Sequence, residues 1–318
     1  MELRLSELLV TRREAIAALV SAMPLIYGCA RQNTPANPDS NALALLDLIA
    51  ENLLRLNPEG ATSLGIDTGS RAAYRSQLTD HSAEGTKKVA DQIRADLEKA
   101  KALDASGLTF ATRTSLEVVK SCYATSLEGF ALPYGDVSVG GWRNTPYVVI
   151  QNVGAYLDIP RFLDSNHPIE NAADAEVYLA RLQSYPKQLD GELGRMQAAR
   201  GAGLVPPAFL IDKALAQIEL SAKNAHEGGS LTESIARRTK NIPGNWAERA
   251  RTIAMQDVAP ALERQIAELQ AQRKTATNDA GIWARPHGDE YYRWALKAST
   301  TTTMSPDEVH EMGQSQLK

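Results

Sequence analysis

The chain has 318 residues, of which 43% are hydrophobic and 23% are charged, and its formal net charge is -4. This composition supports a substantial buried core and excludes an intrinsically disordered chain. Basic and acidic residues are interspersed without a basic patch, which argues against nucleic acid as a partner.

Residues 1–28 have the features of an export signal. Arg12 and Arg13 precede an apolar run from Ala15 to Tyr27. At ~1.5 Å per residue this run spans about 20 Å, which is short of the ~30 Å hydrocarbon core of a bilayer. The run therefore fits a signal peptide better than a transmembrane helix. The paired arginines predict a twin-arginine signal, which implies export of an already folded protein.

Cys29 is the predicted lipidation site. The residues Ile26-Tyr27-Gly28-Cys29 resemble the lipobox of bacterial lipoproteins, in which the cysteine receives diacylglycerol before signal cleavage. Acyl chains on Cys29 would anchor the protein on the periplasmic side of a membrane. Ala30 stands where an aspartate would retain the protein in the inner membrane, so we expect outer-membrane sorting. The alternative is an N-terminal helix with a core cysteine.

Residues 29–41 are polar and contain two prolines, so they are predicted to form a flexible tether. Residues 42–318 are predicted to form one mainly α-helical domain, because apolar residues recur at three- and four-residue steps. Residues 230–233 have the pattern of a capping box. Asn245 is predicted to be an N-cap, and Pro186 and Pro260 are predicted to bend their helices. Helices are expected at about 43–57, 83–103, 109–129, 172–200, 207–226, from 230, and 245–275.

The region 131–171 is the one part of this domain without a helical pattern. It contains Gly140, Gly141, four prolines and the β-prone run from Tyr147 to Ile150. These features predict a short β-hairpin or a long ordered loop. Ordered loops of this length inside compact domains are often functional.

The last predicted helix begins at Ser305-Pro306-Asp307-Glu308, where a capping hydroxyl, a proline and two acids occupy the favoured positions. Val309, Met312 and Leu317 give it an apolar side, and no stop signal precedes Lys318. We therefore expect a chain that is truncated at its C-terminus, whose missing half would cover this helix. A frayed terminal helix docked on the domain is the alternative.

The sequence motifs predict no catalytic residue and no metal ligand in this chain. His310-Glu311 begins like the zinc-peptidase motif His-Glu-x-x-His, but Gln314 takes the place of the second histidine. No cofactor is expected for the same reason. Cys122 has the helical spacing of a small core residue, which is the preferred interpretation over a nucleophile.

Two clusters combine aromatic and polar residues. One lies in the irregular region, and the other begins at His287 and continues into the threonine run 300–303. Tyrosine hydroxyls can donate hydrogen bonds, and an extended threonine-rich segment can pair with a peptide strand. The alternative is that the aromatic residues of the second cluster are packing residues. The candidate substrate-binding residues are Trp142, Arg143, Tyr147, Tyr291, Tyr292 and Thr301.

Five blocks of the sequence occur in an order that resembles a bacterial family, domain of unknown function 885. The blocks are Leu56 to Gly65, Pro146 to Gln151, Asp174 to Leu182, Gly203 to Pro207, and Tyr291 to Thr303. Members resemble mostly helical zinc-dependent peptidases, whose metal motif is a His-Glu followed by Pro-Gly-His-His. These 318 residues do not reach that motif, so the resemblance implies zinc only for a full-length relative.

The leading hypothesis is the N-terminal scaffold and substrate-groove portion of an exported metallopeptidase that is inactive alone. Its expected partners are a peptide-like substrate, the missing C-terminal half, and the membrane through its lipid anchor. The alternative is a non-catalytic helical envelope lipoprotein that binds a peptide or another protein.

Overall fold

The computed structural model describes residues 39–140 and 144–317. The predicted signal peptide with Arg12 and Arg13, the lipidation site Cys29, and nearly all of the tether therefore lie outside the described residues. Trp142 and Arg143 lie outside them as well. The roles assigned to these residues stay predictions.

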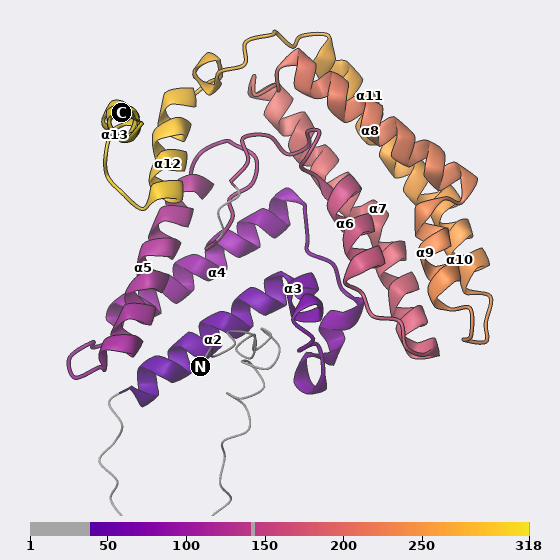
Figure 1. The fold of residues 1–318 in the computed structure, drawn as a ribbon, viewed down its shortest axis with the longest axis horizontal. Helices are drawn as coiled ribbons and strands as arrows, with labels where there is room; N and C mark the ends of the chain where they lie inside the picture. Colours follow the sequence, from indigo (N-terminus) through magenta and orange to yellow (C-terminus); the bar gives the residue numbers. More distant parts are fainter. Residues whose placement is uncertain (1–38, 141–143, 318) are drawn as a thin grey trace, which may run out of the picture. The chain divides into compact units, whose positions relative to one another are not determined.

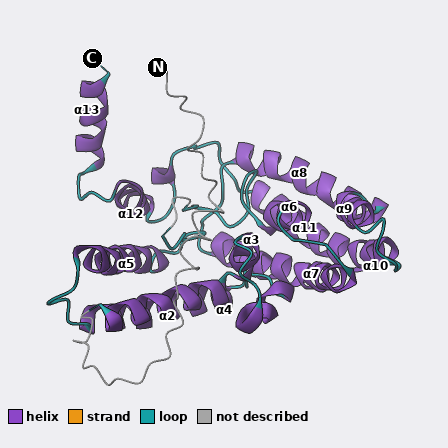
Figure 2. Cartoon of the chain, turned by 60° about the horizontal axis from the view of Figure 1, so that its bottom comes forward, coloured by secondary structure: helices purple, strands orange, loops and turns teal. Residues whose placement is uncertain are grey.

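The described residues are mainly helical, as predicted, and they contain helices and loops without a strand (Figures 1 and 2). None of the described helices is both long and apolar enough to cross a membrane. Short helices of the 3-10 or π type occur at η1 (Gly69–Ser76), η2 (Ala254–Val258) and η3 (Ile282–Ala284). The α-helices are α2 (Ser40–Leu56), α3 (Pro58–Ser63), α4 (Ala83–Ala102), α5 (Phe110–Phe130), α6 (Ala155–Ser165), α7 (Ala172–Gly201), α8 (Ala208–Glu227), α9 (Ser230–Arg238), α10 (Trp246–Ile253), α11 (Ala259–Arg273), α12 (Gly288–Thr300) and α13 (Pro306–Gln316).

The larger core lies between α6 and α11. Helix α11 packs along α7 and α8 (Figure 1), and it contributes Leu262 and Leu269, which are almost completely buried. Leu189 of α7 and Ile218 of α8 join the same cluster. Full burial of each such side chain contributes roughly 1.5–3 kcal/mol. This cluster makes α7 a rigid support for the residues described below.

A second packing region joins α2, α4, α5 and α12. Ile49 of α2, Ile93 of α4 and Tyr123 of α5 form a shared cluster. Helix α12 then packs on α5, and Trp294 lies so close to Gly129 that a methyl group there would stand 2.1 Å from the indole. Glycine is therefore required for this helix pair to approach so closely.

The structure corrects the prediction for 131–171. Helix α6 (Ala155–Ser165) occupies part of this region and contains Pro160. Of the segment before Gly154, residues 131–140 and 144–153 form a loop with isolated antiparallel bridges between Asp136 and Thr145 and between Ile150 and Val153. Of the two predicted alternatives, the loop therefore fits the described residues better than the hairpin, because pairing among them does not extend beyond these single bridges.

The structure confirms some of the predicted helix signals and contradicts others. Ser230 is the first residue of α9 and Gly229 is its N-cap without a side-chain bond, so the capping box predicted there is wrong. The box at Ser305 is confirmed. The bend expected at Pro260 corresponds to the π turn η2 directly before α11. Thr301 has a left-handed φ of 54° and ends α12, so the threonine run does not start as an extended strand.

Candidate functional site

The described parts of the loop 133–149, residues 133–140 and 144–149, line two hollows in the surface, and the second aromatic cluster packs against this loop. The ring of Tyr134 stacks on Tyr291 with centroids 4.2 Å apart, and its hydroxyl donates to the Pro286 carbonyl at 2.8 Å. Arg285 donates from Nε to the Tyr147 hydroxyl at 3.3 Å. These contacts join the two sequence clusters, which lie more than 130 residues apart in the chain.

The first hollow lies between α5 and α12 and is closed at one end by residues 301–303; we call it the α5–α12 groove. Its volume is about 890 Å³, which is within the ~300–1,000 Å³ range of small-ligand sites. Helix α5 supplies Phe110 and Val118, whose exposed fractions are 87% and 60%. Ser138 and Asn144 line the groove from the loop, and Thr301 lines it at the end of α12.

Polar bonds between α5 and α12 fix the walls of the groove. The Trp294 indole donates to the Thr125 carbonyl at 2.7 Å. Lys297 Nζ donates to both carboxylate oxygens of Glu128 at 2.8 Å. The groove is therefore held open by a fixed helix pair, and its lysine is already neutralised.

Cys122 lies in the wall of the groove, half-buried, and packs against the core cluster of Ile49, Ile93 and Tyr123. Burial raises the pKa of its thiol, and hydrogen bonds with Ser126 and the Gly140 backbone oppose this shift only in part. The thiol is therefore protonated near neutral pH and is a poor nucleophile. This chemistry agrees with the sequence interpretation.

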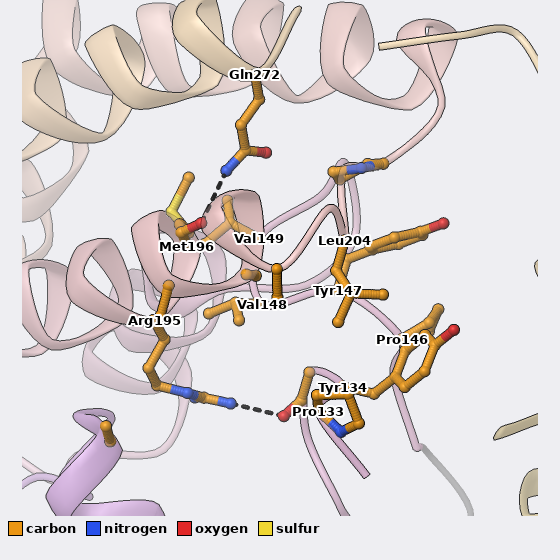
Figure 3. Close-up of a pocket in the computed structure, with 16 residues that line it drawn as sticks. Pro133, Tyr134, Pro146, Tyr147, Val148, Val149, Arg195, Met196, Leu204 and Gln272 are labelled. Atoms are coloured by element: carbon orange, nitrogen blue, oxygen red, sulfur yellow. Dashed lines mark hydrogen bonds between the residues drawn. The ribbon is translucent and has the colours of Figure 1, made fainter. Parts of the chain in front are cut away.

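The predicted substrate-binding residues occupy different positions around the loop. Thr301 lines the α5–α12 groove. Tyr291 is 6% exposed and packs between Tyr134 and Trp294, so it supports the wall as a packing residue. Tyr292 is half-exposed and lines neither hollow. Tyr147 lines the second hollow (Figure 3).

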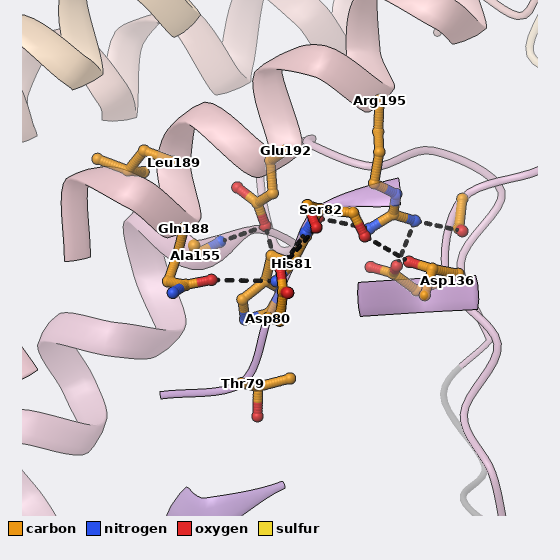
Figure 4. A network of polar contacts seen from close by, with 12 residues as sticks. Thr79, Asp80, His81, Ser82, Asp136, Ala155, Gln188, Leu189, Glu192 and Arg195 are labelled. Atoms are coloured by element: carbon orange, nitrogen blue, oxygen red, sulfur yellow. Dashed lines mark hydrogen bonds and ion pairs between the residues drawn. The ribbon is translucent and has the colours of Figure 1, made fainter. Parts of the chain in front are cut away.

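The second hollow lies between the loop, the C-terminal part of α7 and residues 202–206; we call it the Tyr147 pocket. Its volume is about 240 Å³. Arg195 of α7 stands at its edge and donates to the Gly135 carbonyl and to Asp136 Oδ1, both at 2.6 Å. These two bonds tie the loop to α7 (Figures 3 and 4).

A buried polar network lies next to Arg195, around Glu192 (Figure 4). The Glu192 carboxyl accepts from the Ala155 N–H at 2.8 Å and from Gln265 Nε2 at 3.1 Å. His81 Nδ1 lies 3.8 Å from it. Sequence reasoning missed this network because Glu192 and His81 stand in ordinary charged stretches that carry no motif.

The protonation of this network follows from its burial. Burial raises the pKa of Glu192 to about 8, and the Asp136 charge adds to this, whereas the Ala155 N–H, Gln265 and Arg195 act in the opposite direction. Burial also lowers the pKa of His81. Both groups are therefore mainly neutral at pH 7, so their contact is not an ion pair.

The zinc implied by the family resemblance does not fit the residues at hand. Over 39–140 and 144–317, no three His, Cys, Asp or Glu side chains lie where they could share a metal ion. His310 is exposed, and its Nε2 lies 2.8 Å from Gln314 Nε2. We therefore derive no reaction step that passes through zinc.

Two comparisons place the chain among known proteins, while no curated protein matches it. Its fold is similar to one described as "the crystal structure of the putative lipoprotein from Colwellia psychrerythraea", with a TM-score of 0.78 and 18% sequence identity. The match covers 88% of this chain and 49% of that protein, so this chain spans about half the length of its structural neighbour. The family model described as "Bacterial protein of unknown function (DUF885)" matches residues 58–318. The chain therefore belongs to the DUF885 family.

Proposed function

We propose that the chain is an exported, lipid-anchored protein whose α5–α12 groove binds a peptide-like substrate. The observation that carries this proposal is the groove itself, which combines a large volume with exposed apolar side chains and a polar rim. Exposed apolar surface rimmed by polar groups is typical of binding sites in otherwise soluble domains.

The lining of the groove favours an extended, peptide-like ligand. Phe110 and Val118 offer apolar contacts to side chains, while Asn144 and the hydroxyls of residues 301–303 offer hydrogen bonds to a peptide backbone. Lys297 is neutralised by Glu128, and Glu117 is paired with Lys120. Arg113 also lines the groove, and its Nη2 donates to the Leu108 carbonyl at 3.3 Å, so this cation can also meet a carboxylate of a bound peptide.

We further propose that the chain supplies scaffold and groove to a metallopeptidase whose metal-binding residues lie elsewhere. The DUF885 membership supports this role through the family's resemblance to zinc-dependent peptidases, and the structural neighbour is about twice as long. The described residues lack a metal-binding cluster. We therefore expect the chain alone to bind peptides without cleaving them.

The proposed location rests on the N-terminal sequence. Arg12 and Arg13 before an apolar run, followed by Gly28-Cys29, have the order of a twin-arginine lipoprotein signal. The structural neighbour is itself described as a "putative lipoprotein". Together they support a protein that acts in the envelope and is held by lipid at Cys29.

Fluorescence anisotropy with a fluorescein-labelled pool of random decapeptides tests peptide binding by the purified chain. Val118→Asp places a charge in the groove, and Leu220→Asp is its matched control, because Leu220 is 58% exposed on α8, outside the groove. We expect saturable binding that is weakened at least fivefold by Val118→Asp and unchanged by Leu220→Asp. Absence of saturable binding, or equal effects of both variants, would contradict the proposal.

A further inference from the structure

We propose that the Tyr147 pocket is a second binding site, which takes one uncharged ring-sized group such as an indole or phenol. This site is separate from the groove, because different residues line the two hollows. Nothing in the lining of the α5–α12 groove is shared with this pocket.

The size and the lining of the pocket define the class of ligand. Its volume is about 240 Å³, whereas a cavity of about 150 Å³ is enough to bind benzene. Carbon atoms dominate its walls, which are formed by proline rings and by aliphatic side chains. The principal ones are Pro133, Pro146, Val148, Val149 and Leu204 (Figure 3), together with Pro206.

The guanidinium and amide side chains in the lining, Arg195 and Gln272, allow a neutral ring and disfavour an anion. Arg195 already donates to Gly135 and Asp136, so its charge is compensated. Gln272 uses its Nε2 to donate to the Met196 carbonyl at 3.3 Å and to Glu268 at 3.1 Å. These bonds leave the Gln272 carbonyl oxygen as an acceptor for the N–H or O–H at the edge of a ring.

The walls are fixed by contacts that do not depend on a ligand. Gly135 N–H donates to the Pro146 carbonyl at 3.2 Å, and Arg195 holds the Gly135 carbonyl. Tyr134 is held by stacking on Tyr291, and Tyr147 is held by Arg285. A preformed pocket loses little conformational entropy on binding, which favours affinity for a small group.

The pocket can be filled by a single substitution on α7. Ala198, Ala199 and Ala202 line it, and Ala199 is partly buried there. Ala199→Leu would place its side chain in the open volume. Ala180 lies on the exposed surface of the same helix and outside the pocket, so Ala180→Leu is the matched control.

Saturation-transfer NMR with indole and with N-acetyl-tryptophanamide tests the site on the purified chain. We expect binding of one or both probes, weakened at least tenfold by Ala199→Leu and unchanged by Ala180→Leu. Binding of both indicates a site for a peptide side chain, and binding of indole alone indicates a site for a free small molecule. Failure of both probes, or binding that survives Ala199→Leu, would overturn the proposal.

Two further measurements separate the test of this pocket from a folding defect and from the proposal for the groove. Thermal unfolding shows whether Ala199→Leu is folded, and Ala202→Leu replaces it if it is not, with the same expected result. Val118→Asp in the groove should leave indole binding unchanged. Peptide binding in the groove and ring binding in the pocket can therefore fail separately.

Discussion

Replacing Glu192 by glutamine should remove a pH dependence of stability that the buried carboxyl imposes. The pKa of Glu192 is about 8 in the folded chain, against an ordinary value of 4.5. Between these values the folded state holds a proton that the unfolded state releases. Stability therefore falls as pH rises through this window and levels off above the folded pKa. The full shift of about 3.5 units corresponds to roughly 5 kcal/mol.

Two buried histidines also make stability depend on pH, which limits the pH range in which the Glu192 effect can be measured. Burial lowers the pKa of both His81 and His167 below the ordinary 6.5. These residues therefore make stability rise with pH below 6.5, which opposes the Glu192 effect there. Between pH 6.5 and 8 the histidine effect fades, and the Glu192 effect alone amounts to roughly 1.6 kcal/mol, because the carboxyl is only half ionised at its folded pKa.

Urea unfolding at four pH values from 6.5 to 8 measures this effect. The free energy of unfolding of the wild type, minus that of Glu192→Gln at the same pH, should fall by roughly 1.6 kcal/mol from pH 6.5 to 8 at constant m-values, because the remaining histidine effect is common to both chains. Glu219→Gln, at an exposed position on α8, should keep the wild-type profile. A difference between the wild type and Glu192→Gln that does not change over this range would refute the reasoning.

Three other predictions address packing and export. Gly129→Ala would place a methyl group 2.1 Å from the indole of α12. It should lower the free energy of unfolding by about 1–3 kcal/mol in denaturant titrations. Gly194→Ala meets open space and should not lower the free energy of unfolding. Cys29→Ser should abolish incorporation of labelled fatty acid, and Cys122→Ser should retain it; label in the first variant would exclude lipidation at residue 29. Exchange of the paired signal arginines for lysine should leave precursor in the cytoplasm on cell fractionation, and normal export would show that the twin-arginine interpretation is wrong.

The sequence revealed the helices with an uninterrupted apolar period. Helices α4 and α5 begin and end within two residues of their predicted bounds, and Ser305 caps α13 as expected. Helix α6 was missed because its proline and those around it suggested a loop. Helix α12 was missed because His287 precedes it with a left-handed φ of 59° and makes no side-chain cap.

The site was less accessible to sequence reasoning because it depends on long-range contacts. Thr301 and Tyr147 were selected for their chemistry, but the sequence could not show that they line two different cavities. In the sequence, Phe110 and Val118 have the pattern of ordinary helix residues. Their exposure follows from how α5 packs in the folded chain. Glu192 likewise acquires its raised pKa from burial that no local pattern encodes.

Photo-cross-linking from inside the groove tests the central claim most directly. The photoreactive amino acid p-benzoylphenylalanine would replace Phe110, which is 87% exposed in the groove, or Leu64, which is 62% exposed outside it. After irradiation with the decapeptide pool, mass spectrometry should find intact peptides attached at position 110 and few or none at position 64. Equal labelling at both positions, or none at position 110, would contradict a peptide-binding groove between α5 and α12.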